Sequence, residues 1–109
     1  MIKIKQGEDY RKVLVFQYAD SLEYVDLSGV TAFSEMRDKP NGTLAATGTC
    51  TVIAGRGEIT ALYDSAQTAE IEPGEYGFDI WVVDSDEEKH PVYEARVKVV
   101  GSYTDMGGE

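Results

Sequence analysis

The chain has 109 residues, and 20 acidic against 10 basic side chains give it a formal net charge of −10 at pH 7. This length is typical of one domain with one hydrophobic core, and the acidic balance disfavours binding to nucleic-acid phosphates or to an anionic membrane surface. The single cysteine, Cys50, excludes an internal disulfide. No apolar run approaches the ~18 residues of a membrane span, and the first residues lack the long apolar segment of a secretory signal peptide.

The alternation of apolar and polar residues predicts about seven β-strands, with a turn every ~8–12 residues. The strongest turn signal is residues 38–42, which hold a proline and the pair Asn41-Gly42 that suits positive φ. In residues 30–37 the alternation turns Ser34 inward and Phe33 outward, whereas a β-bulge would return Phe33 to the core. The predicted strands are residues 2–5, 10–19, 30–37, 47–53, 59–63, 76–83 and 92–100.

Residues 64–71 are the one helical candidate, because Asp64 or Ser65 can cap a helix and the following alanines favour it. Together these elements predict an all-β, antiparallel β-sandwich with one short helical turn, and a β-barrel is the rival architecture. We expect a single sandwich domain over residues 1–101, followed by a flexible C-terminal tail over residues 102–109.

Several short motifs follow one another in a distinctive order. Lys5-Gln6-Gly7-Glu8-Asp9 precedes Val25-Asp26-Leu27-Ser28-Gly29-Val30 and Met36-Arg37, and the stretch 73–80 reads PGEYGFDI before the closing strand. This order resembles the immunoglobulin-like domains of tailed-phage structural proteins, in particular the N-terminal domain of phage baseplate upper proteins. The resemblance covers residues 3–101 and implies an immunoglobulin-like sandwich. In that family a bulky inward residue is expected where Ser34 stands.

The resemblance implies a non-enzymatic virion structural protein of a phage or prophage, a tail or baseplate component that acts by protein–protein assembly. The expected partners are other virion or tail proteins and further copies in a homo-oligomer, with no nucleic acid, membrane, small-molecule substrate or cofactor. The expected location is the virion, after synthesis in the bacterial host cytoplasm. Two alternatives stay open. One is an acidic DNA-mimic inhibitor of a nucleic-acid enzyme, and the other is a glycan- or calcium-binding accessory domain of a host-recognition apparatus.

The sequence holds no catalytic constellation. His90, the only histidine, is interpreted as a loop residue among solvated charges, because no nucleophile motif accompanies it. The stretch that follows residue 83 opens like a calcium loop, but Lys89 stands where the turn glycine is required. We therefore expect a plain hairpin loop and no metal site. The weak metal candidates are Asp84, Asp86 and Glu88.

Cys50 is interpreted as an inert, buried thiol, because residues 47–53 contain no basic side chain to activate it. For Trp81 a core position is the favoured interpretation, and an exposed contact is the alternative. Apolar side chains on outward faces are candidates for an assembly surface. The candidate interaction residues are Ile2, Ile4, Val13, Val15, Phe33 and Trp81.

The charge is unevenly distributed along the chain. Residues 64–88 hold nine acidic side chains and no lysine or arginine, whereas residues 1–12 hold four basic and two acidic ones. Such opposed patches favour head-to-tail association of copies, while solubility alone is the simpler interpretation. Residues 2–5 are expected to add to a neighbour's sheet as an edge strand.

Overall fold

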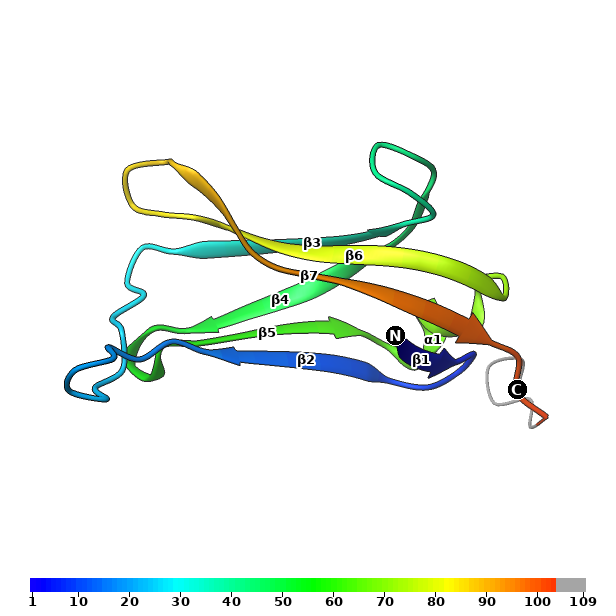
Figure 1. Cartoon of the computed structure of the whole chain (residues 1–109), viewed down its shortest axis with the longest axis horizontal. Coiled ribbons are helices and arrows are strands. Elements are labelled where there is room, and N and C mark those ends of the chain that lie inside the picture. The colour runs from blue at the N-terminus through cyan, green and yellow to red at the C-terminus, as the bar shows by residue number, and fades with distance from the viewer. Residues whose placement is uncertain (104–109) are drawn as a thin grey trace.

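Strand β4 (Leu44–Ile53) joins two packed layers, because each half of it belongs to a different one (Figure 1). Its first half pairs with β3 and its second half with β5, in the continuous order β1-β7-β6-β3-β4-β5-β2. The computed structural model describes residues 1–103. The other elements are β1 (Ile2–Lys5), β2 (Tyr10–Val15), β3 (Thr31–Arg37), η1 (Ala54–Arg56), β5 (Glu58–Tyr63), α1 (Ser65–Ala69), β6 (Gly74–Val83) and β7 (Lys89–Val100).

The all-β prediction is confirmed: residues 1–103 form an immunoglobulin-like β-sandwich of seven strands, with the short α-helix α1 and the 3-10 turn η1. All the strand pairs are antiparallel except β1 with β7, which is parallel. Asp64 caps α1 by accepting a hydrogen bond from the Gln67 N–H, as the helical candidate predicted. The predicted tail from residue 102 onward lies mostly outside the described residues.

The core forms where the inward faces of the two layers meet, as the two-residue alternation requires. The Phe78 ring packs edge-to-face against Tyr10 and Tyr63, with 5.8 Å between ring centroids in each pair. This aromatic contact links strands β2, β5 and β6 across the two layers. The buried apolar residues are Ile4, Met36, Ile59, Ala61, Tyr63, Ile71, Phe78, Ile80, Val97 and Val99.

Ser34 stands in this core where the family resemblance implied a bulky residue, and the structure shows what fills the space. The Tyr63 phenol crosses from the opposite layer and lies 2.7 Å from the Ser34 hydroxyl, which itself donates to the Asp79 carbonyl at 2.7 Å. Because Ser34 has a single hydrogen to donate, Tyr63 donates to Ser34. Burial raises the pKa of Tyr63, so this phenol stays a neutral donor. Gly48 lies beside the pair and leaves room for the Tyr63 ring.

One sequence expectation about strands needs correction, and the outward position that the alternation gave Phe33 is confirmed. β1 pairs with β7 of its own chain and Ile4 is fully buried, so Ile4 is a core residue and not a contact for a partner. Phe33 lies outward with 57% of its surface exposed, and no bulge returns it to the core, because the neighbouring Ser34 is held inward. At the turn after β3, Asn41 adopts the positive φ that its sequence predicted.

Replacement of Gly48 by alanine should destabilise the fold. The added Cβ would lie 3.0 Å from the Tyr63 ring and 3.2 Å from the Ser34 Cβ, so the Gly48→Ala variant should lose about 1–3 kcal/mol by overpacking. Urea unfolding measures this loss. Gly77→Ala is the matched control, because its Cβ would meet only ordinary contacts at 3.6 Å or more. Equal stability of the two variants would contradict this account of the core.

Candidate metal site at the hairpin between β6 and β7

The loop between β6 and β7, residues 84–88, is closed by its own backbone. The Asp84 N–H donates to the Glu88 carbonyl at 2.9 Å, and the Glu87 N–H donates to the Asp84 carbonyl at 3.0 Å. Glu87 takes a left-handed conformation with φ of 64°, which is unusual for a residue other than glycine. The tight turn brings the residue that leaves β6 back beside the first residues of β7.

The Asp84 carboxylate is the centre of this loop. One of its oxygens, Oδ1, accepts hydrogen bonds from the backbone N–H groups of Asp86 and Glu88, both at 2.9 Å. The other oxygen, Oδ2, lies 3.0 Å from Nε2 of His90. The hydrogen bond from the Glu88 N–H, followed by that from His90, lowers the pKa of Asp84 below its ordinary value. Asp84 is therefore a fixed carboxylate at neutral pH, with one oxygen aimed at His90.

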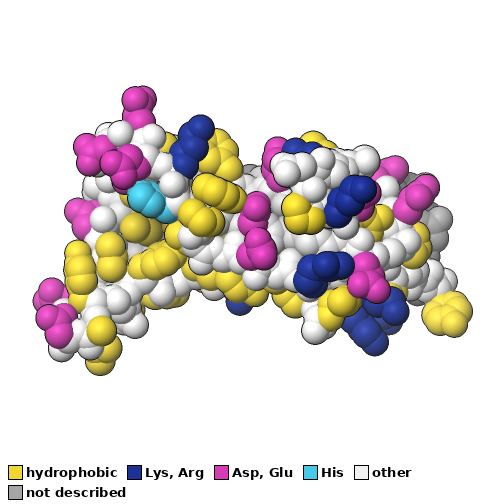
Figure 2. Space-filling model, turned by 45° about the horizontal axis from the view of Figure 1, so that its top comes forward, with side chains coloured by type: hydrophobic (Ala, Val, Ile, Leu, Met, Phe, Trp, Pro, Cys, Tyr) yellow, Lys and Arg dark blue, Asp and Glu magenta, His cyan; other side chains and the backbone are white. Residues whose placement is uncertain are grey.

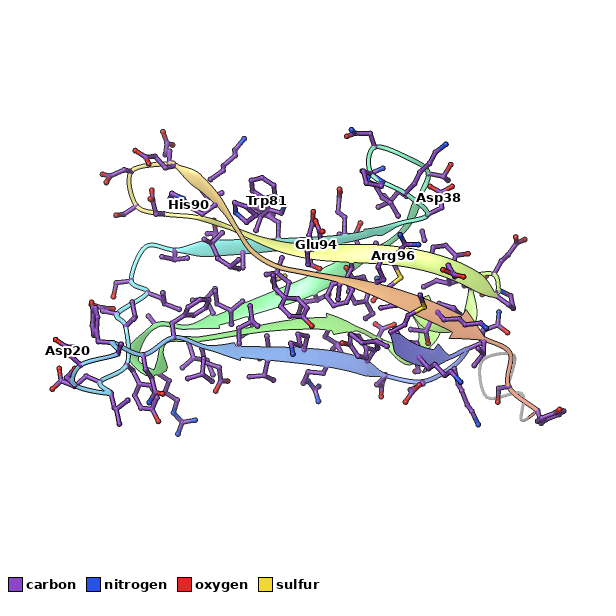
Figure 3. The ribbon with its side chains drawn as sticks, in the orientation of Figure 1. Asp20, Asp38, Trp81, His90, Glu94 and Arg96 are labelled. Carbon is purple, nitrogen blue, oxygen red and sulfur yellow. The ribbon has the colours of Figure 1, made fainter. Side chains whose placement is uncertain are left out.

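Asp84, Glu88 and His90 form a cluster in which one potential ligand atom from each lies within 4.8 Å of the others. Figure 2 shows acidic side chains gathered around the only histidine on one lobe of the molecule, and Figure 3 shows His90 beside the hairpin. A carboxylate pair with an imidazole is a ligand set typical of divalent transition metals.

The sequence predicted part of this set. Asp84 and Glu88 were weak metal candidates, whereas Asp86 is not a member of the cluster, and His90 was interpreted as a plain loop residue. A usable signal was present, because Asp84, Glu88 and His90 lie within seven residues of one another in the sequence. The sequence did not show the tight turn that brings Asp84 back beside His90.

The other predicted contact residues lie apart from this cluster. Val13 and Val15 are exposed on β2, and Ile2 is half-buried against the core. The core position favoured for Trp81 is wrong: the side chain is 38% exposed, and its Nε1 donates to the Asp79 carboxylate at 3.0 Å. Trp81 is the cross-strand neighbour of Phe33.

Phe33 and Trp81 line a groove of about 1010 Å³ on the outer face of β3, β6 and β7. The hairpin between β3 and β4 bounds one end of the groove, and the start of β7 bounds the other (Figures 1 and 3). Cys50 lies elsewhere, half-buried on β4, and burial raises the pKa of its thiol. No helix in residues 1–103 is long and apolar enough to cross a membrane.

Comparison with solved structures returns the crystal structure of CopC from Methylosinus trichosporium OB3b. The two folds superpose with a TM-score of 0.51 over 94% of this chain and 86% of that one, at 16% sequence identity. No protein-family model and no curated protein sequence matches the chain. The resemblance to phage domains therefore still rests on the sequence motifs alone.

The structural comparison overturns two expectations. CopC is a periplasmic copper-binding protein, so the prediction of a phage tail or baseplate component is wrong by this comparison. The prediction of a virion location is wrong for the same reason. At 16% identity the similarity establishes the shared fold, and the activity of this chain has to be argued from its own residues.

The lowered pKa of Asp84 predicts how stability depends on pH. Its folded value lies below the unfolded one, so the carboxylate stabilises the fold above pH ~4 and loses that effect as the pH falls through the folded pKa. In the presence of a chelator, the wild type should be more stable than Asp84→Asn at pH 7. The difference should shrink as the pH falls below about 4.

Urea midpoints between neutral pH and pH ~3 measure this effect. Asp86→Asn removes one charge from the same loop but none of the Asp84 hydrogen bonds, so it is the matched control. A stability difference between the wild type and Asp84→Asn that does not change with pH would contradict the electrostatic role of Asp84.

Proposed function

We propose that the chain is a metal-binding β-sandwich domain that holds a divalent transition-metal ion at Asp84, Glu88 and His90. The observation that carries the proposal is the convergence of one imidazole nitrogen and two carboxylate oxygens within 4.8 Å at one hairpin. With metal–ligand bonds of about 2.0–2.2 Å, neighbouring ligand atoms around a tetrahedral ion lie roughly 3.3 Å apart. The 3.0 Å between His90 Nε2 and Asp84 Oδ2 is already close to that separation.

The donor set favours particular ions. Imidazole nitrogen suits copper and zinc, whereas calcium and magnesium prefer oxygen ligands throughout. Among divalent ions of the first transition row, Cu²⁺ binds such mixed sites most tightly. CopC, which shares the fold, is a copper-binding protein, and this supports Cu²⁺ as the first ion to test. The calcium loop considered for Asp84, Asp86 and Glu88 is replaced in this proposal by a transition-metal site that includes His90.

The fold orients one of the three ligands and leaves the other two exposed to solvent. Asp84 is already oriented by two backbone N–H groups, so little ordering is needed at this ligand when an ion binds. Glu88 and His90 are exposed, which leaves the remaining coordination positions open to water or to a partner's ligand. We propose a role in binding or carrying the ion, without catalysis by this chain.

Cu²⁺ and Zn²⁺ should bind tag-free protein with one ion per chain, and Ca²⁺ should bind much more weakly. His90→Gln keeps an amide that can donate to Asp84 but removes the imidazole, so it should weaken Cu²⁺ affinity at least about tenfold. Asp86→Asn should leave the affinity unchanged, because Asp86 lies outside the cluster. Isothermal titration calorimetry with each ion alone measures these affinities.

Cys50→Ala excludes binding at the one thiol and should retain full affinity. The proposal fails if Cu²⁺ and Zn²⁺ do not bind, or if His90→Gln and Asp86→Asn weaken binding to the same extent. Loss of Cu²⁺ binding in Cys50→Ala would place the ion at the thiol instead.

A further inference from the structure

The floor of the groove carries charged and apolar residues in an ordered series. Cross-strand pairing places side chains from β3, β6 and β7 side by side, and each series member lies about 6.8 Å from the next along the strands. From the end near α1, the series is basic, acidic, apolar and basic. Its members are Arg37 and Arg96, then Glu35, Asp79 and Glu94, then Phe33 and Trp81, and finally Lys89.

The acidic members of the series are only partly compensated. Glu35 pairs with Arg37 at 2.9 Å, whereas Glu94 forms no ion pair with any residue from 1 to 103. Carboxylates that face each other across neighbouring strands repel one another. A cation that enters the groove above Asp79 would relieve this repulsion. The exposed Trp81 and Phe33 beside it offer an apolar surface for the same ligand.

The outer face of the opposite layer presents the complementary series. It is formed by β2 and β5, and it also starts at the end near α1, where β5 leads into the helix. Along this face the side chains are acidic, basic, apolar and acidic. Its members are Asp9 and Asp64, then Arg11, then Val13, and finally Glu58 beside Val15.

We propose that the groove binds the β2–β5 face of a second copy of this chain. The two series have the same spacing and opposite charge at every charged position, so a copy stacked in the same orientation sets Arg11 over the carboxylates of the groove. It also sets Val13 over Phe33 and Trp81. This proposal is independent of the metal site, because neither series contains Asp84, Glu88 or His90.

The geometry fixes the type of contact. The two faces lie on opposite sides of the sandwich (Figure 1), so the association is head-to-tail and extends to a ring or a stack. Addition of a strand at the β2 edge is disfavoured, because Lys12 reaches across that edge to lie 4.6 Å from the centre of the Tyr93 ring. The copies therefore meet at these two faces and not at the β2 edge.

Native mass spectrometry from micromolar to millimolar concentration, with a chelator present, tests this inference. The wild type should form oligomers that weaken as salt rises. Arg11→Glu should lower the association constant at least about tenfold. Lys3→Glu makes the same charge change at an exposed residue that belongs to neither series and does not line the groove, so it should have little effect. Trp81→Glu disables the groove and should also give monomers, with circular dichroism confirming that each variant is folded.

A mixture of Arg11→Glu and Trp81→Glu then gives a sharp result. The first variant keeps an intact groove and the second keeps an intact β2–β5 face, so together they should form a dimer with one copy of each and no larger species. A wild type that stays monomeric throughout would overturn the inference. So would a mixture that stays monomeric, or a Lys3→Glu variant as defective as Arg11→Glu.

Discussion

The Tyr63 phenol and the Ser34 hydroxyl meet between the two layers, and the arrangement of the groove face follows from that contact. Ser34 is held inward by Tyr63 and by the Asp79 carbonyl, each at 2.7 Å. Since successive residues of a strand project to opposite sides, an inward Ser34 sends Phe33 and Glu35 outward. The same register with β6 places Trp81 opposite Phe33 and Asp79 opposite Glu35. A buried hydrogen bond thereby determines which side chains reach the groove.

Two hairpins give the outer face its shape. The hairpin between β3 and β4 and the one between β6 and β7 rise at opposite ends of the outer layer, and the groove lies between them (Figure 2). The second hairpin also carries the candidate metal ligands at its turn. The two proposals thus concern separate surfaces: the metal site lies at the turn of the hairpin, and the groove lies on the outer face of β3, β6 and β7. The loop that would hold the ion is closed by Asp84, while the groove depends on the strands that the loop connects.

Much of the fold could be predicted from the sequence. The alternation predicted β5, β6 and β7, and in the structure Ile59, Phe78 and Val97 are buried with the same two-residue period, because one face of each strand is covered. The cap at Asp64 and the positive φ at Asn41 were local signals and were also confirmed. The exposed position of Trp81 was missed, because alternation separates two faces but does not reveal which of them a second layer covers.

For the candidate metal site, too, some features follow from the sequence and others only from the tertiary structure. The sequence by itself determined the donors, since Asp84, Glu88 and the single histidine lie within seven residues of one another. It also determined the strands that flank them. Only the tertiary structure decided that His90, and not Asp86, joins the two carboxylates, because the register of β6 with β7 returns His90 to Asp84. Likewise, the order of charges across the groove exists only after β3 pairs with β6, which is distant from it in sequence, and β7 pairs with β6. Local patterns specify which residues alternate, whereas strand pairing specifies which residues meet.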